Sequence, residues 1–426
     1  MVAKSTDFAR AILVPMHQSD LLPASAVAKE RPWLLAFLIA PAAVIAIGLV
    51  DGALSYLLRK QGIDPARGSE IVALLTVPHT IYFLWCPITD FWIRRRSWVL
   101  VASAAAAVTM VVAFNQSSLA SPWSIRLIFL SFCFGLLVAA SCGGIMGTFR
   151  SEVNRRRSGS FYQCGSLAFS GLAVFALVEL ADRVSLGTLG WVIAAMIFFP
   201  ALMALALPNE PVQSQQKMSE AAAHIWHEFK ATFFRWDAIP YTLLVTLPMC
   251  SGAMLGLLPA LAVDYGVTGP QVAWMNGLGG VLLTALGSLS AALIPVRVRS
   301  PIAFLLAGVA NAGTLSILAL GPLRPSVYFT GTVLYLFSIG ICYALFTGVI
   351  LEFLGESGKS GGARYSIINS LGNLPVAYMS YVDGRGYAHW GARGMPAIDA
   401  LLSVTAATSL LIYFLLHRAP KHVVAG

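Results

Sequence analysis

Charged residues are scarce in this sequence of 426 residues. Asp, Glu, Lys and Arg together make up only 11% of it, whereas hydrophobic residues make up 58%. A soluble chain carries about 25% charged residues, so this one has too few to cover the surface of a soluble protein of its size. The composition also excludes a disordered, collagen-like or nucleic-acid-binding protein, despite a net charge of +9. We therefore expect lipid to surround most of the chain.

The signatures of enzymes, metal sites and disulfide frameworks are also missing. The six cysteines stand singly in apolar runs, without the spacing of a zinc site or of a redox pair. The sequence has no GxSxG nucleophile elbow and no HExxH zinc motif. Gly358-Lys359-Ser360 resembles the end of a phosphate loop, but the first glycine of that motif is replaced by Phe353. We expect no enzymatic activity, no cofactor and no bound metal.

Long apolar runs dominate what is present. Stretches of about 18 or more apolar residues can cross a bilayer as helices, and twelve occur here. Six lie in the first part of the chain, at residues 33–58, 69–89, 98–115, 125–149, 160–180 and 189–207. Six more follow, at residues 238–263, 271–294, 302–320, 327–354, 365–382 and 397–416. The runs predict an all-α polytopic membrane protein with twelve transmembrane helices.

A polar segment divides these spans into two sets of six. We predict a six-helix bundle over residues 33–207, a cytoplasmic linker over 208–237 and a second six-helix bundle over 238–416. Charged and apolar residues alternate in 218–234 as in an amphipathic surface helix. Residues 1–32 and 417–426 form the tails. The apolar stretch 11–16 is too short for a signal peptide, so we expect the internal spans to direct insertion.

The lysines and arginines predict the orientation, because they are enriched in cytoplasmic loops. With both termini in the cytoplasm, the cytoplasmic tails and loops carry 20 of the 28 basic residues. The sequence therefore predicts a multi-pass protein of the inner membrane with both ends inside. Insertion and contact with anionic lipid account for the basic balance, which leaves no argument for a nucleic-acid partner.

The loop after the second span combines an acid with a cluster of arginines. Asp90 stands at the cytoplasmic end of the span and is followed by Arg94, Arg95 and Arg96. Asp90 can lie against a helix N-terminus or pair with a loop arginine, which would hold the cytoplasmic side shut until the halves rock apart. The alternative is a positively charged membrane anchor beside an acid that ends a helix.

This loop carries a resemblance to a known family. The run from Pro78 to Asp90, with Phe83-Leu84-Trp85 and Pro87, and the following Arg95-Arg96-Ser97-Trp98 resemble the loop motif of the major facilitator superfamily. The form is similar to that of the AmpG-like muropeptide permeases, the acetyl-CoA transporters and the RhtX/FptX-type siderophore permeases. Gly165-Ser166-Leu167 and Ser370-Leu371-Gly372 also echo each other between the halves, as expected of two pseudo-symmetric bundles.

The resemblance implies transport by alternating access. We expect a secondary active transporter, driven by protons, that moves a medium-sized polar solute such as a muropeptide across the inner membrane. The alternatives are an importer of siderophores or other metal chelates, and an exporter of drugs or metabolites. The expected partners are the solute, protons and lipid, and we expect a monomer.

Two residues are candidates for proton coupling. Asp51 lies inside the first span, where a carboxyl group requires a partner or a water-filled cavity and can take up and release a proton. His79 lies near the middle of the second span and could relay protons to Asp51. The alternatives are a structural, hydrogen-bonded acid at Asp51 and a packing role for His79.

Polar groups in the later spans are candidates for solute binding. Pro248 and Gly252 interrupt the seventh span, and several amide and phenol groups lie within the neighbouring spans. Such groups can bind sugars, peptides or chelates when they face a cavity. The candidate cavity residues are Asn276, Tyr335, Tyr343, Asn369 and Asn373.

Overall fold

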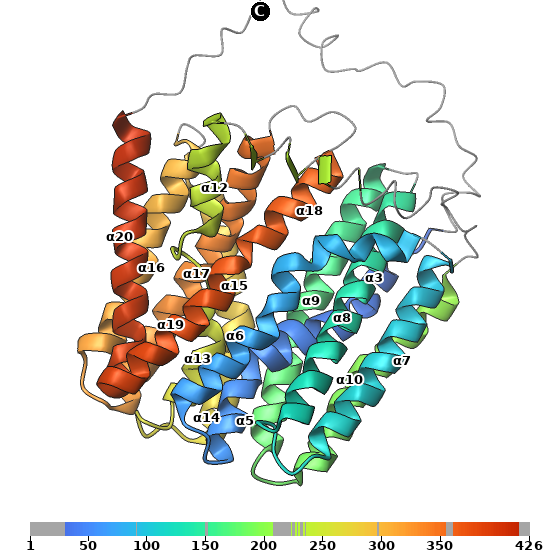
Figure 1. Ribbon diagram of the computed structural model, residues 1–426, viewed down its shortest axis with the longest axis horizontal. Helices are drawn as coiled ribbons and strands as arrows, with labels where there is room; N and C mark the ends of the chain where they lie inside the picture. The colour runs from blue at the N-terminus through green and yellow to red at the C-terminus, as the bar shows by residue number, and fades with distance from the viewer. Residues whose placement is uncertain are drawn as a thin grey trace, which may run out of the picture.

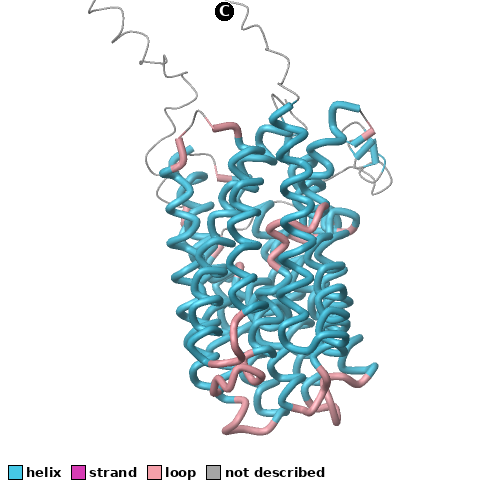
Figure 2. Tube along the Cα trace, turned by 90° about the vertical axis from the view of Figure 1, so that its left-hand side faces the viewer, coloured by secondary structure: helices cyan, strands magenta, loops and turns pink. Residues whose placement is uncertain are grey.

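The computed structural model describes residues 30–90, 92–149, 152–207, 236–295, 298–354 and 361–416, and seven separate positions between 223 and 234. Most of these residues are helical, and none of them is in a β-strand. The helices run along the long axis of the bundle, and loops gather at its two ends (Figure 2). The predicted all-α polytopic membrane fold is therefore confirmed.

The first group of helices is formed by residues 32–206. A composite first helix joins a 3-10 turn (Pro32–Leu34), α3 (Leu35–Leu38), α4 (Ala40–Ala43), a π-helical stretch (Val44–Ala53) and α5 (Leu54–Lys60). It is followed by α6 (Pro65–Ile81), two 3-10 turns (Tyr82–Leu84 and Cys86–Asp90), α7 (Arg95–Phe114), α8 (Pro122–Thr148), α9 (Glu152–Leu180), α10 (Leu186–Ala201) and a 3-10 turn (Leu202–Ala206).

The second group of helices is formed by residues 236–416. It begins with a 3-10 turn (Trp236–Ala238), α12 (Ile239–Thr246) and α13 (Ala253–Leu261), then α14 (Gly269–Val272), a π-helical stretch (Ala273–Leu278), α15 (Gly279–Ser290) and a 3-10 turn (Ala291–Leu293). The remaining helices are α16 (Ser300–Leu320), α17 (Pro325–Leu354), α18 (Gly361–Gly372), α19 (Leu374–Trp390), a 3-10 turn (Gly391–Arg393) and α20 (Gly394–Leu416).

Nine stretches of the described chain are long and apolar enough to cross a membrane. The last of them, Ile367–Leu416, passes through both α19 and α20 and so makes two crossings. Two further crossings fall outside this count. Helix α6 has only 17 residues, and the crossing made by α12 and α13 is interrupted between them. The described residues thus make twelve crossings, as predicted.

Several predicted boundaries are wrong, among them the start of the fifth span, which is at Glu152 rather than residue 160. The second crossing starts at Pro65 and loses its α-helical form at Ile81, three residues after Pro78, whose ring nitrogen cannot donate a backbone hydrogen bond. The seventh is not one continuous helix, and the eleventh runs from Gly361 to Trp390 with a break at residue 373. The amphipathic helix predicted for 218–234 and the two tails lie mostly outside the described residues.

Figure 1 shows the two groups of helices side by side, the second on the left and the first on the right. We call the end of the bundle that carries Glu30 and Leu416 the termini side, and the opposite end the far side. Helix α6 packs against α19, α9 against the π-helical stretch Ala273–Leu278, and the first helix against α13. These pairs, together with contacts of α18 with α6 and the 3-10 turn Tyr82–Leu84 and of α14 with α9, join the two groups.

Several helices that start at the far side have local caps. The side chain of Asp64 accepts a hydrogen bond from the backbone N–H of Ala66 at the start of α6, at 2.8 Å. Ser121 and Ser185 accept from the backbone N–H three residues later, at the starts of α8 and α10. Each cap satisfies a backbone donor that the helix leaves unpaired.

Large apolar side chains cover the outside of the bundle. Leu293 and Leu320 are each 84% exposed, and Leu289 and Trp191 are more than half exposed. Soluble monomers rarely expose apolar surface on this scale. Lipid tails would contact these side chains, in keeping with the membrane-spanning helices.

Candidate functional site

Asp51 lies in the π-helical stretch Val44–Ala53 of the first helix. Its Oδ1 atom is buried and has no hydrogen-bond partner in the described part of the chain. π-Helical turns are rare and occur frequently at functional sites. A buried carboxyl oxygen without a donor costs about 1–3 kcal/mol of stability. The position of Asp51 is therefore better explained by a function than by a contribution to folding.

The two groups of helices meet closely beside Asp51. Gly256 of α13 faces the Asp51 backbone so directly that a Cβ atom on Gly256 would lie 3.4 Å from the Asp51 Cα. One turn further along the first helix, the hydroxyl group of Ser55 donates to the carbonyl oxygen of Gly256. Ser55 is only 2% exposed. Asp51 thus lies at the boundary that alternating access would rearrange.

Tyr343 reaches this boundary from α17. Its hydroxyl oxygen lies against Gly252, where an added Cβ atom would come within 2.1 Å of it. Gly252 has a φ angle of 79°, a left-handed conformation that favours glycine. Tyr343 is 40% exposed and interacts electrostatically with Asp51. Among the five predicted cavity residues, Tyr343 is the one whose described interactions include Asp51.

The other predicted cavity residues have local partners. Asn276 donates through Nδ2 to the Tyr328 hydroxyl group at 2.9 Å, within the second group of helices. The Nδ2 of Asn373 donates to the carbonyl oxygen of Asn369 at 2.9 Å, beside the break between α18 and α19. Tyr335 is 1% exposed and belongs to the core. These contacts are those of packing groups, and solute binding by the four residues stays a prediction.

His79 packs against aromatic rings. Its ring centroid lies 6.0 Å from that of Tyr82 and 5.8 Å from that of Phe132. Within the described part of the chain no hydrogen bond joins His79 to Asp51. The contacts are those of a packing residue, and a relay between His79 and Asp51 stays a prediction.

The predicted cytoplasmic gate lies at the termini side. Asp90 ends the 3-10 turn Cys86–Asp90, and its side chain is outside the described residues. Arg95 donates through Nη1 to the Gly144 carbonyl oxygen at 2.8 Å, and Arg96 donates to that of Leu207 at 3.2 Å. These bonds join α7 to the ends of α8 and α10. Arg94 is exposed and precedes the first residue of α7, and the gate stays a prediction.

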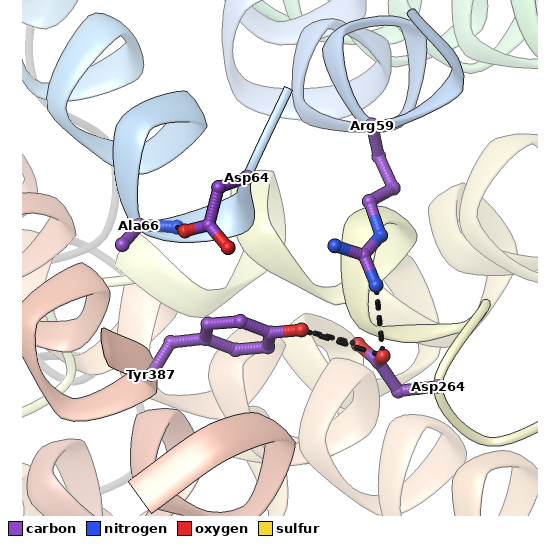
Figure 3. Close-up of polar contacts among 5 residues, drawn as sticks. All are labelled: Arg59, Asp64, Ala66, Asp264 and Tyr387. Carbon is purple, nitrogen blue, oxygen red and sulfur yellow. Dashed lines mark hydrogen bonds and ion pairs between the residues drawn. The ribbon is translucent and has the colours of Figure 1, made fainter. Parts of the chain in front are cut away.

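A polar cluster that was not predicted joins the two groups at the far side (Figure 3). Arg59, near the end of α5, donates through Nη2 to Oδ1 of Asp264 at 2.9 Å, and Asp264 follows α13 in the second group. The hydroxyl group of Tyr387 in α19 donates to the same carboxylate, at 3.2 Å from Oδ2. The Arg59 and Asp264 side chains are 25% and 18% exposed, so this ion pair is partly shielded from water.

A second far-side contact lies next to this cluster. Lys60 pairs with Asp182 and also donates to the carbonyl oxygen of Ala181, between α9 and α10. A Cβ atom on Gly269, at the start of α14, would lie 3.0 Å from Oδ2 of Asp182. The sequence could have indicated Arg59 and Lys60 as ion-pair candidates, because few basic residues lie in the far-side loops and each can be checked for an acidic partner. Sequence spacing did not show which acid it would be.

Comparisons with known proteins agree with this architecture. No protein-family model matches the sequence. The chain is 22% identical over 368 residues to a Rickettsia conorii protein named as a candidate transporter, AmpG 4, over 78% of this chain and 86% of that protein. Its fold is similar to that of the nucleoside transporter NupG, with a TM-score of 0.69, 16% identity, and coverage of 90% of this chain and 99% of that one.

Two other solved structures have a similar fold. A D-xylose–proton symporter matches with a TM-score of 0.67 and 15% identity, over 91% of this chain and 96% of that one. A transporter of the POT family, solved with a thioalcohol-conjugated peptide, matches with a TM-score of 0.66 and 10% identity, over 89% and 95% of the two chains. The chain thus has the major facilitator fold that its motifs indicate, and it resembles an AmpG-like transporter.

Proposed function

We propose that this multi-pass membrane protein, which shares its fold with solute symporters, is a secondary transporter that uses proton binding at Asp51 to drive alternating access. The observation that carries the proposal is the buried Asp51 oxygen without a partner at the boundary between the two groups of helices. A carboxyl group in that position can be neutral in one conformation and charged in the other. The solute passes through unchanged.

The proposed solute is a medium-sized polar molecule such as a muropeptide. The loop motif around Asp90 and the similarity to AmpG 4 both support this class. Tyr343 is a candidate solute contact, because the residue is 40% exposed and its phenol group lies at the boundary near Asp51. Asn276, Tyr335, Asn369 and Asn373 remain candidates on the basis of the sequence.

The proposed orientation places the termini side in the cytoplasm of the cell and the far side outside the inner membrane. The bias of basic residues toward the termini side supports it. Asp90 and the three arginines then form the cytoplasmic gate, and Arg59 with Asp264 forms part of the outer one. A reporter fused after Arg418 should accordingly be cytoplasmic, and one inserted between Gly266 and Pro270 should be external.

Uptake into proteoliposomes tests the function. Labelled anhydro-muropeptide, a ferric siderophore and acetyl-CoA would each be offered with and without an imposed pH gradient. We expect anhydro-muropeptide to accumulate only with the gradient, and to be recovered chemically unchanged. Accumulation of the ferric siderophore instead would show that the substrate is a metal chelate rather than a muropeptide, and proton-driven transport would still hold. No gradient-driven uptake of any of the three would contradict the proposal.

The Asp51→Asn variant tests the coupling residue. Asn has nearly the same size but cannot titrate, so accumulation against a gradient should be lost while solute exchange without a gradient survives. Tyr343→Phe is the matched variant for solute contact, because it removes one hydroxyl group and should weaken solute binding without removing proton coupling. A well-folded Asp51→Asn protein that still accumulates solute with the pH gradient would exclude Asp51 from coupling.

A further inference from the structure

Two carboxyl groups lie side by side within the second group of helices. Asp383 of α19 is 0% exposed, and Asp399 of α20 is 3% exposed. The two side chains are within hydrogen-bonding distance of each other. Ser403, one turn further along α20, donates to Oδ1 of Asp399 at 2.9 Å. Apart from this acidic neighbour, both oxygens of Asp383 lack a hydrogen-bond partner in the described part of the chain.

Among the residues that the structure describes, no basic side chain interacts with the two carboxyl groups. Tyr335 of α17, Tyr378 of α19 and Cys250, between α12 and α13, interact electrostatically with the pair. Tyrosine and cysteine side chains are neutral near pH 7. Arg385 is two residues beyond Asp383 but exposed, since a rotation of about 200° places it on the other side of the helix. From α6 the facing residue is Ser69, which does not titrate.

A proton between the two carboxyl groups explains how two buried acids can lie side by side without a basic partner. An ionised carboxylate can only accept hydrogen bonds, so two of them cannot bond to each other. Two adjacent negative charges also repel each other strongly when they are buried. One shared proton supplies the missing donor to Asp383 and halves the charge of the pair. Paired carboxyl groups titrate as a unit for the same reason.

We propose that Asp383 and Asp399 form a second proton-binding site, in which one proton is shared between the two carboxyl groups. The site is separate from Asp51, because it belongs to helices α19 and α20 of the second group. It deepens the proposed transport function, which so far rests on one carboxyl group in the first helix.

The position of the pair connects it to both moving parts. Gly384, the next residue after Asp383, packs so closely on α6 that a Cβ atom there would lie 1.6 Å from Oγ of Ser69. On the other side, the Ser403 hydroxyl group also lies 3.2 Å from the carbonyl oxygen of Pro248, in the interruption between α12 and α13. Loss of the proton would therefore act on the contact between α6 and α19.

A metal cation is the alternative occupant. Asp383, Asp399, Ser403 and the Pro248 carbonyl group supply oxygen atoms, which suit a hard cation. Calcium takes about 6–8 oxygen ligands and magnesium about six, more than the four groups described here, and the Asp383 oxygens have no other hydrogen-bond partner in the described part of the chain. We therefore assign the site to a proton, and sodium is examined in the test.

Infrared spectroscopy of the protein in liposomes tests the site. A protonated carboxyl group gives a C=O stretching band that a carboxylate lacks, and ¹³C-aspartate labelling shifts it. We expect the wild type at pH 7 to show this band for a buried aspartate. The part of the band that comes from the pair should be lost in both Asp383→Asn and Asp399→Asn, because the amide group supplies the donor that the remaining carboxylate needs. Asp51→Asn should keep the part of the band that these two variants lose.

Three outcomes would overturn the proposal. They are absence of the labelled band in the wild type, an undiminished band in both folded Asn variants of the pair, and removal of the pair's part of the band by sodium at constant ionic strength. If an Asn variant of the pair fails to fold, the band of the Asp51→Asn protein decides the proposal instead. Because uptake is not measured, a missing band would leave the transport function standing. A protein with the band but without uptake would instead contradict the transport function alone.

Discussion

The two ends of the bundle use their charged residues in different ways. At the far side, Arg59 of the first group of helices pairs with Asp264 of the second. At the termini side, Arg95 and Arg96 donate to carbonyl groups of the first group itself. The far-side pair must therefore separate when the groups move apart there, whereas the termini-side bonds can persist through the same movement.

This difference separates the contacts that select a conformation from those that stabilise one group. A contact across the groups exists in one state and is lost in the other, so its removal shifts the population between the states. A contact within a group exists in both states, so its removal changes stability alone. The described state has cross-group polar bonds at the far side, so the two groups are held together there.

Gly384→Ala should open the far side most strongly. The added methyl group would lie 1.6 Å from Oγ of Ser69, so α6 and α19 must separate. Overpacking of this kind costs about 2 kcal/mol, which corresponds to about a 30-fold shift of population toward the far-side-open state. Spin labels at Ser117, in the loop between α7 and α8, and at Ser326, in the first turn of α17, are exposed on the far side of the two groups and should report a longer distance.

The controls for this variant are a distant glycine and a compensating change. Gly313→Ala adds the same methyl group where no atom lies within 4 Å of it, and it should leave the distance unchanged. Adding Ser69→Ala to Gly384→Ala removes the nearest atom and should restore part of the closed population. The exposed Cys164 is replaced before labelling. An unchanged distance in folded Gly384→Ala would show that the α6 and α19 contact does not hold the far side closed.

Asp264→Asn should open the same side by a smaller amount. It removes the charge that Arg59 faces, and a partly exposed ion pair contributes about 1 kcal/mol, equivalent to about a fivefold shift. The same spin-label pair measures it. Glu70→Gln is the matched control, because Glu70 pairs with Arg67 inside α6. If both variants shifted the distance equally, general loss of charge rather than the cross-group pair would be responsible.

Asp90→Asn should act in the opposite direction and be the smallest effect. If Asp90 closes the termini side through a helix N-terminus, its charge contributes about 0.5 kcal/mol, equivalent to about a twofold shift toward the termini-side-open state. Labels at Leu205 and Leu293, both exposed at that side, should move apart, and transport should slow. Arg157→Gln removes an exposed charge of the same side and serves as the control. Unchanged distance and uptake in Asp90→Asn would leave Asp90 as a helix end.

The spans could be predicted from the sequence because bilayer insertion requires long apolar runs, whatever the fold. The interruption of the seventh span was also indicated, by Pro248 and Gly252. The sequence did not indicate how far the interruption extends, because Pro259, which could also have broken the helix, lies inside α13. A proline interrupts a helix only where the neighbouring backbone cannot find other partners, and a single sequence does not show those partners.

Asp383 was missed for a physical reason. The run Asp383-Gly384-Arg385-Gly386 has the composition of a loop, so the eleventh span was predicted to end at residue 382. The structure continues α19 through it to Trp390. The glycines are required by close packing: a Cβ atom at Gly386 would lie 2.7 Å from a carbonyl oxygen of α20. Local composition cannot distinguish a glycine for packing from a glycine for a turn.

The far-side pair was missed because its members are 205 residues apart. Asp51, in contrast, was recognised because a single acid in an apolar run is unusual by itself. Residues that are exceptional in their own segment can thus be identified from the sequence. Residues whose function depends on a partner from another helix require the three-dimensional arrangement.

The caps at the starts of α6, α8 and α10 determine which hydrogen bonds are kept when the far side opens. Asp64, Ser121 and Ser185 each satisfy a backbone donor of their own helix. Water that enters between the two groups would therefore meet helix ends whose capped amides are already protected. In hydrogen-exchange measurements, the amides of these first turns should keep the same protection in both states. The free energy of opening then comes from side-chain contacts between the groups, and the helices move as rigid bodies.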